Sequence, residues 1–203
     1  MKKIIAILLT SVMLFVVPVF ASKQNAELPF FEVRLNGTSV ESSNRQYPLL
    51  VYKGITYVPM TYHDCRYLGI TTDWDSETST LTVQKGDVSC AYRAQEQNDP
   101  NSSQCIVTEC DFNIVVNGKR IDNSKEEYPL LLFRQITYFP LTWRFAVEEF
   151  GWEYYYDSQS GLSINSGNQY IHTLSLPHFT GNAATDGEYY YYIGDKDGKS
   201  VVY

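Results

Sequence analysis

The stretch YPLLVYKGITYVP (residues 47–59) returns 81 positions later as YPLLLFRQITYFP (residues 128–140). Eight of its positions are identical in the two copies. Extending the comparison outward aligns residues 31–86 with residues 112–167, with two small gaps. A duplication of this length predicts one folding unit that is present twice.

Each copy contains two hairpin signals. FEVRLNG and FNIVVNG alternate apolar and polar residues and end in Asn-Gly, which favours a two-residue hairpin turn at Asn36–Gly37 and at Asn117–Gly118. Residues 47–59 and 128–140, which we call the doubled stretch, predict a second hairpin. It turns at Lys53–Gly54 in the first copy and at Arg134–Gln135 in the second. We expect four short strands at the start of each copy.

A short helix follows in each copy. Its apolar residues recur at the spacing of one helix face, and a glycine ends it as the expected left-handed cap. These residues are Tyr62, Cys65, Leu68 and Gly69 in the first copy and Trp143, Ala146, Val147, Phe150 and Gly151 in the second, where the helix is one residue longer. TTDWD and TLTV, or EYYYD and LSIN, close each copy as strands. The predicted fold class is α+β: two tandem units, each an antiparallel sheet packed on one short helix.

The pattern of strand, Asn-Gly, TYVP, helix, Leu-Gly and Trp-Asp resembles the repeat of the copper amine oxidase N-terminal (stalk) domain family. The residues that carry the resemblance are Asn36, Gly37, Tyr57, Val58, Pro59, Leu68, Gly69, Trp74 and Asp75, then Asn117, Gly118, Tyr138, Pro140, Leu141, Gly151 and Asp157. The second copy departs from the pattern at Phe139, Phe150 and Tyr156. The resemblance implies an exported, non-catalytic bacterial domain without the copper ligands and cofactor-forming tyrosine of the oxidase.

The chain divides into five parts. Residues 1–21 have the basic start, apolar run and small-residue end of a secretory signal peptide, and an uncleaved membrane anchor is the alternative. The first repeat is expected at 28–86, a cysteine-bearing insert at 87–111 and the second repeat at 112–167. After cleavage no membrane span is expected, and the localisation is secreted or cell-surface.

The tail, residues 168–203, is expected to be β-rich and incomplete. TDGEYYYYIGDKDGKSVVY resembles the opening strands of a β-propeller-type repeat region, and one such hairpin does not close a propeller. DKDGK at 195–199 lacks the later ligands of a calcium loop, so an Asp-Gly hairpin turn is predicted there.

Composition disfavours several classes of function. The net charge is −7 and no Lys/Arg cluster occurs, which argues against binding to nucleic acid or anionic lipid. His63, His172 and His178 are the only histidines, too few for an oxidase-type copper site, so no metal or cofactor is expected. No catalytic motif is present, and the adjacent residues of His63-Asp64-Cys65 do not face one another on a helix.

The four cysteines fit export, which permits disulfides. A bridge from Cys90 to Cys105 or to Cys110 is the candidate, because it closes the polar excursion AQEQNDPNSSQ. Unpaired thiols are the alternative, since the connectivity of disulfides cannot be deduced from spacing. Cys65 lies on the apolar helix face and is expected to be a core residue.

These observations predict a non-catalytic cell-envelope module: a spacer, or a domain that binds a cell-wall glycan or an envelope protein. The candidate glycan-stacking residues are Trp152, Tyr154 and Tyr156, with core packing as the competing interpretation because alternate residues of a strand point to opposite faces. The alternative function is an accessory domain of a cell-wall-acting or oxidase enzyme whose catalytic part is absent from this chain.

Overall fold

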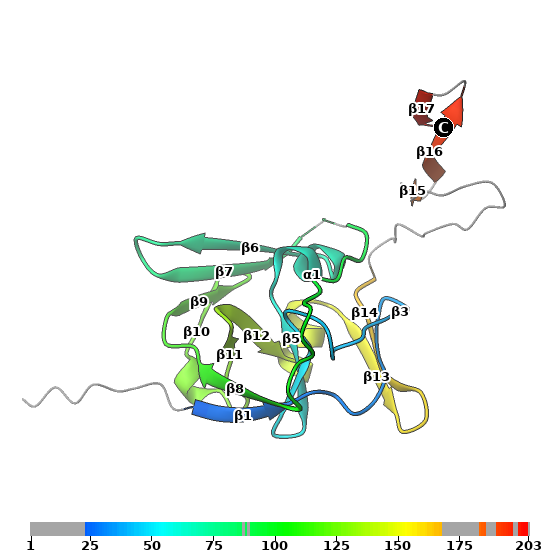
Figure 1. Cartoon of the computed structure of the whole chain (residues 1–203). Helices are drawn as coiled ribbons and strands as arrows, with labels where there is room; N and C mark the ends of the chain where they lie inside the picture. Colours follow the sequence, from blue (N-terminus) through cyan, green and yellow to red (C-terminus); the bar gives the residue numbers. More distant parts are fainter. Residues whose placement is uncertain are drawn as a thin grey trace, which may run out of the picture.

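The computed structural model describes residues 23–86, 88 and 90–167, and the backbone of three further strands within 183–202 (Figure 1). The predicted signal peptide and two of the histidines, His172 and His178, lie outside the described residues.

The centre of the fold is a closed antiparallel barrel in the strand order β1-β4-β5-β12-β11-β8. Its strands are β1 (Lys23–Glu27), β4 (Leu50–Tyr52), β5 (Ile55–Pro59), β8 (Gln104–Glu109), β11 (Leu131–Phe133) and β12 (Ile136–Pro140). The two predicted hairpins of the doubled stretch are β4–β5 and β11–β12, and β5 pairs with β12. The barrel is therefore built jointly by the two copies.

The barrel has an approximate two-fold symmetry. Where β5 meets β12, Val58 pairs with Phe139, its own counterpart in the second copy. Where β1 meets β8, Asn25 pairs with Ile106, which lies 81 positions further along the chain. The strand β8 thus corresponds to β1, although it falls within the stretch expected as an insert. Both junctions between the copies lie on the same pseudo-two-fold axis.

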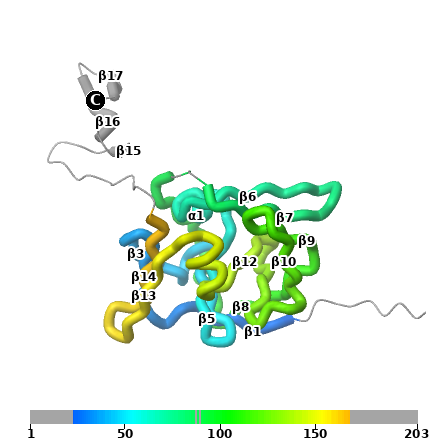
Figure 2. Tube along the Cα trace, turned by 180° about the vertical axis from the view of Figure 1, so that it is seen from behind, coloured from blue at the N-terminus to red at the C-terminus, as the bar shows by residue number. Residues whose placement is uncertain are grey.

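Two four-stranded sheets flank the barrel, in the orders β10-β9-β7-β6 and β13-β14-β2-β3. Their strands are β2 (Val33–Leu35), β3 (Thr38–Ser39), β6 (Ile70–Asp75), β7 (Thr80–Lys85), β9 (Asn113–Val116), β10 (Lys119–Ile121), β13 (Glu153–Asp157) and β14 (Gly161–Asn165). The parallel pairs β7–β9 and β14–β2 join the last hairpin of one copy to the first hairpin of the other. Figures 1 and 2 show the two sheets on opposite sides of the barrel.

The predicted fold class was wrong. The described part of the chain is predominantly β with a closed barrel, and its helices are short: α1 (Tyr62–Tyr67), a 3₁₀ turn η1 (Asn123–Lys125) and a π-helix η2 (Trp143–Glu149). The hairpin signals correctly predicted which strands pair within each hairpin. The error was to pair the hairpins within each copy, because a hairpin pattern says nothing about which strand its free edge will meet.

The extra residue of the second helix explains a second difference. Phe150 N–H donates to Phe145 O at 3.0 Å, five residues back, so the insertion is absorbed as π-helical turns. The predicted helix face is buried at Ala146 and Phe150, and Phe145 and Glu149 are buried as well, whereas Trp143 is 63% exposed. Its counterpart Tyr62 is also exposed, because both residues occupy the first position of their helix.

Alternation along β5 and β12 buries both faces of the doubled stretch. Tyr57 and Tyr138 point into the barrel, while Val58 and Phe139 join a second, larger core between the barrel and the flanking elements. The barrel interior is made of Ala26, Leu50, Tyr52, Tyr57, Cys105, Val107, Leu131, Phe133 and Tyr138. The repetition of this stretch is therefore accounted for by packing.

A buried ion pair ties a loop to α1. Arg45 Nη2 donates to both carboxylate oxygens of Asp64, at 2.7 and 2.8 Å, and both side chains are almost fully buried. In the second copy the corresponding loop position holds Glu126, which pairs with Arg144 at a more exposed place. Both copies thus join this loop to the helix by an ion pair, but Arg144 aligns with His63 and not with Asp64, so the two pairs are not equivalent residue by residue.

The tail forms a separate sheet in the order β15-β16-β17, with β15 (Ala183–Thr185), β16 (Tyr190–Lys196) and β17 (Lys199–Val202). Lys196 pairs with Lys199, which confirms the predicted two-residue hairpin. Within the described residues, no helix has the length and apolar character needed to cross a membrane.

Candidate functional site

Two aromatic pairs, each with one exposed and one half-buried ring, occupy equivalent positions in the two flanking sheets. Phe31 meets Tyr156 edge to face with ring centroids 5.3 Å apart, and Phe112 meets Trp74 in the same manner at 5.3 Å. Phe31 corresponds to Phe112 in the duplication and Tyr156 corresponds to Trp74. Because the sheets exchange hairpins, each pair joins one residue from each copy.

The strand register brings the first pair together. Tyr156 lies opposite Leu162 on β14, and Leu162 lies opposite Val33 on β2, two residues after Phe31. Leu162 N–H donates to Glu32 O at 2.8 Å and fixes the start of the parallel pairing. Gly161 permits this approach: its φ is +78°, and a Cβ atom there would lie 2.1 Å from Glu32 O.

A hollow of about 380 Å³ opens beside this pair. Its lining is apolar and largely aromatic: Phe30, Phe31, Val51, Gly54, Ile55, Thr56, Leu141, Tyr154, Tyr156 and Leu162. We call it the tyrosine hollow. Tyr156 is 51% exposed, and Phe30 is exposed almost entirely and stacks edge to face on Phe31. Such a hollow presents ring faces and edges to solvent without a buried charge in its lining.

The structure separates the three predicted glycan-stacking residues. Tyr154 and Tyr156 share one face of β13 and line the tyrosine hollow. Trp152 is only 3% exposed, packs on Phe150 and donates its indole N–H to Leu68 O at 2.9 Å. Trp152 is therefore a core residue, and Tyr154 and Tyr156 remain the candidates for ligand contact.

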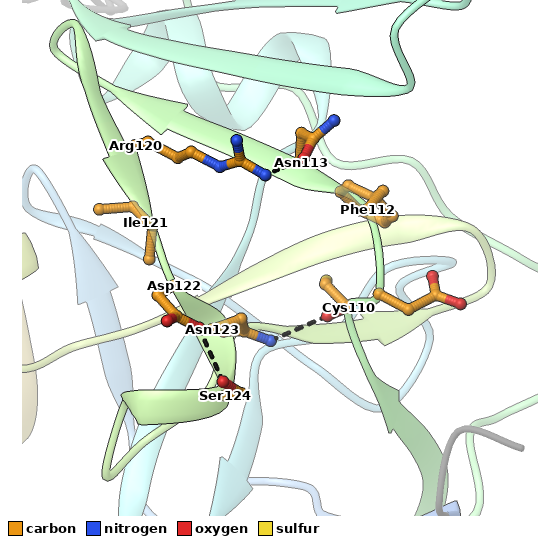
Figure 3. A pocket seen from close by; sticks show the side chains of 9 residues that line it. Cys110, Phe112, Asn113, Arg120, Ile121, Asp122, Asn123 and Ser124 are labelled. Atoms are coloured by element: carbon orange, nitrogen blue, oxygen red, sulfur yellow. Dashed lines mark hydrogen bonds between the residues drawn. The ribbon is translucent and has the colours of Figure 1, made fainter. Parts of the chain in front are cut away.

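Each aromatic pair also stands beside a polar groove at an equivalent place. The Phe31 groove, of about 350 Å³, is lined by Leu28, Pro29, Phe30, Phe31, Glu32, Val33, Ser39, Val40, Glu41, Ser42 and Ser43. The Phe112 groove, of about 540 Å³, is lined by Cys110, Asp111, Phe112, Asn113, Arg120, Ile121, Asp122, Asn123 and Ser124 (Figure 3). Corresponding residues of the two copies line the two grooves, so duplication produced both.

The four cysteines are free thiols in the structure, and the expected bridge is not formed. Cys105 lies in the barrel core and Cys110 in the outer core, whereas the Cys90 thiol contacts His63 O at 3.5 Å. Burial raises the pKa of all of these thiols, that of Cys110 to about 12. The bridge from Cys90 to Cys105 or to Cys110 stays a prediction.

His63, Asp64 and Cys65 form no nucleophilic site. Asp64 accepts from Arg45 and from the Thr61 hydroxyl, which also caps α1. The Cys65 thiol contacts Met60 Sδ at 3.6 Å, and burial, with a smaller effect of Asp64, raises its pKa. A thiol with a raised pKa is a poor nucleophile. Among the described residues, no group of three metal-ligating side chains is found.

Four aromatic residues of these pairs were not predicted from the sequence as parts of a site: the exposed Phe30 and Trp74 and the half-buried Phe31 and Phe112. A signal was present, since Phe31 with Phe112, and Trp74 with Tyr156, keep an aromatic residue at the same place in both copies. Comparison with protein-family models, curated proteins and solved structures finds no match for the chain.

Proposed function

We propose that the chain is a non-catalytic exported module of the cell envelope that binds glycan through the tyrosine hollow. The observation that carries the proposal is the set of exposed ring faces of Phe30, Tyr154 and Tyr156 around one apolar hollow. Isolated exposed aromatics are ordinary, but a contiguous apolar patch on a soluble domain marks a binding surface.

The composition of the hollow favours a sugar over a protein partner. Aromatic rings combine a large apolar face with a low entropic cost, and tyrosine adds a hydroxyl that exchanges hydrogen bonds with water or ligand. The C–H face of a pyranose ring matches such a ring face, while its hydroxyls can exchange hydrogen bonds with the hydroxyls of the exposed tyrosines. A few polar groups in an apolar hollow are the usual design of a small-ligand site.

The test is co-sedimentation of residues 22–203, which include every described residue, with purified peptidoglycan and with cellulose. Tyr156→Ala is expected to weaken retention at least tenfold, which corresponds to about 1.4 kcal/mol. Tyr155→Ala is the matched control: Tyr155 is 66% exposed on the same strand but points to its opposite face. It should leave retention unchanged.

Two outcomes would contradict the proposal. One is the absence of retention on either polymer by a folded protein. The other is an equal loss from the Tyr155 and Tyr156 substitutions, which would indicate a non-specific contribution of surface aromatics.

A further inference from the structure

We infer that the tyrosine hollow and the Phe31 groove form one extended site, which binds a linear, uncharged glycan across the Phe30 ring. The inference rests on the proposed glycan binding of the tyrosine hollow and deepens it. It assigns two properties of the ligand: a length greater than a disaccharide, and the absence of carboxylate and phosphate groups.

The hollow and the groove share one wall. Phe30 and Phe31 belong to the lining of both, and the hollow continues on one side with Tyr156. The three rings follow one another edge to face, with centroids 5.2 Å apart for Phe30 and Phe31 and 5.3 Å apart for Phe31 and Tyr156. Phe31 packs against the outer core and anchors this row of rings. A ligand that lies on the row therefore reaches both the hollow and the groove.

Phe30 forms the ridge between them. It is 87% exposed, so it adds almost nothing to the burial that stabilises the core. Its edge-to-face contact with Phe31 nevertheless holds the ring in one orientation, which makes it a stacking surface. The volumes of about 380 and 350 Å³ are at the small end of ligand sites, so a longer chain has to cross the ridge.

The groove offers hydrogen-bond acceptors where the hollow offers rings. The polar side chains of its lining are Glu32, Ser39, Glu41, Ser42 and Ser43. Ser43 N–H donates to Glu41 Oε1 at 2.9 Å, which holds the carboxylate in place and lowers the pKa of Glu41 below its ordinary value. Glu41 is therefore ionised at neutral pH, and an ionised carboxylate is a strong acceptor for the hydroxyls of a sugar.

The charge of the ligand follows from the two linings. The tyrosine hollow is lined by uncharged residues, and neither lining contains a lysine or an arginine. Arg34 neutralises Glu32 at 2.9 Å, whereas Glu41 forms no ion pair within the described part of the chain. A carboxylate or phosphate on the glycan would meet this like charge without a compensating cation. An uncharged sugar meets acceptors and ring faces.

The second flanking sheet differs at the residues that join the hollow to the groove. Asp111 stands at the place of Phe30, and Thr72 at the place of Tyr154. The Phe112 groove therefore has a carboxylate where the Phe31 groove has the ridge. Because the duplicated fold forms with either set of residues, packing does not account for Phe30 and Tyr154, and a ligand does.

The experiment is calorimetric titration of residues 22–203 with the dimers and hexamers of cellulose and of chitin, and with the hexamer of galacturonic acid. We expect one site per chain. A neutral hexamer should bind at least tenfold more tightly than its dimer, because the dimer occupies the hollow and the hexamer also fills the groove. The acidic hexamer should bind at least tenfold more weakly than the neutral one.

Variants separate the two parts of the site. Tyr156→Ala should weaken the dimer and the hexamer alike. Glu41→Ala should weaken the hexamer at least tenfold and leave the dimer unchanged, since a hydrogen bond to a charged group is lost in the groove. Glu41→Gln, which keeps an acceptor and removes the charge, should narrow the difference between the acidic and the neutral hexamer. Asp122→Ala changes the counterpart of Glu41 in the second copy and is the matched control.

The outcomes distinguish the extended site from the proposed function. A hexamer that binds no more tightly than its dimer, while Tyr156→Ala still abolishes binding, overturns the extended site and retains the proposed function. Equal losses from Glu41→Ala and Asp122→Ala also overturn the extended site. An acidic hexamer that binds as tightly as the neutral one overturns the assignment of charge. No binding of either neutral hexamer by the folded protein overturns the extended site, and retention on peptidoglycan or cellulose then decides separately about the tyrosine hollow.

Discussion

The contact between Gly161 and Glu32 allows the interleaved fold to be tested by a single methyl group. Gly161 begins β14 where β14 leaves its own hairpin and runs beside β2 of the other copy. An alanine Cβ would lie 2.1 Å from Glu32 O and 2.9 Å from Glu32 C, which are backbone atoms that cannot rotate away. Either β14 or β2 has to move, and the Leu162–Glu32 hydrogen bond is then lost.

Two other glycines isolate the steric part of this cost. Gly37 and Gly118 have φ values of +81° and +78°, close to the +78° of Gly161, but nothing lies within 4 Å of a Cβ at either position. Alanine at Gly118 therefore pays only the left-handed backbone cost of about 1–2 kcal/mol. Alanine at Gly161 combines this backbone strain with the clash, and together they lower the free energy of unfolding by roughly 3–5 kcal/mol.

The assay is thermal unfolding followed by circular dichroism. One kcal/mol shifts the melting temperature by about 2–4 °C for a domain of this size, so Gly118→Ala should lower it by roughly 2–8 °C. Gly161→Ala should lower it by roughly 6–20 °C. Equal shifts for the two variants would refute the close approach of the copies at this point.

Three further predictions concern buried tyrosines and cysteines. The Tyr57 hydroxyl donates to Pro129 O at 3.1 Å, whereas the buried Tyr138 hydroxyl has no partner among the described residues. Tyr57→Phe should therefore lower the free energy of unfolding in urea by about 1 kcal/mol, and Tyr138→Phe should leave it almost unchanged. The reverse order would contradict the assigned hydrogen bond. Burial raises the pKa of Cys110 from 9 to about 12. This thiol therefore contributes stability that is fully present below pH 9 and is lost as the pH rises towards 12. The melting temperature should fall across that pH range, and the fall should be smaller in the Cys110→Ala variant. All four thiols should react with iodoacetamide in denaturant without reductant, while a requirement for reductant would support the Cys90 bridge instead.

The sequence allowed the local structure of this protein to be predicted but not its assembly. Asn36–Gly37 and Lys53–Gly54 form the expected turns because positive φ at consecutive residues strongly restricts the choice of residue. The alignment of the copies located the equivalent strands from residue 31 onward, but it missed the correspondence of β1 and β8. The exchange of hairpins was not predictable from the pattern of apolar residues. By that pattern alone, β14 could pair with β2 or with β9, its counterpart in the second copy.

The candidate site could not be predicted in full, because it is assembled by the exchange of hairpins. Tyr154 and Tyr156 were identified from composition, but their partners Phe30 and Phe31 lie about 120 residues earlier and meet them only through the exchanged sheet. Trp152 was indistinguishable from them in sequence, although its indole is committed to a hydrogen bond in the core. Exposure at the end of a hairpin, and not alternation alone, decides which aromatic residues remain available to a ligand.

The two copies exchange hairpins and thereby build both aromatic pairs. The most direct measurement is a nuclear Overhauser experiment on isotopically labelled protein, which reports protons within about 5 Å across paired strands. The exchange of hairpins predicts backbone contacts of Leu162 with Val33 and of Leu81 with Ile114. Contacts of Leu81 with Val33 and of Leu162 with Ile114, within each copy, would contradict it.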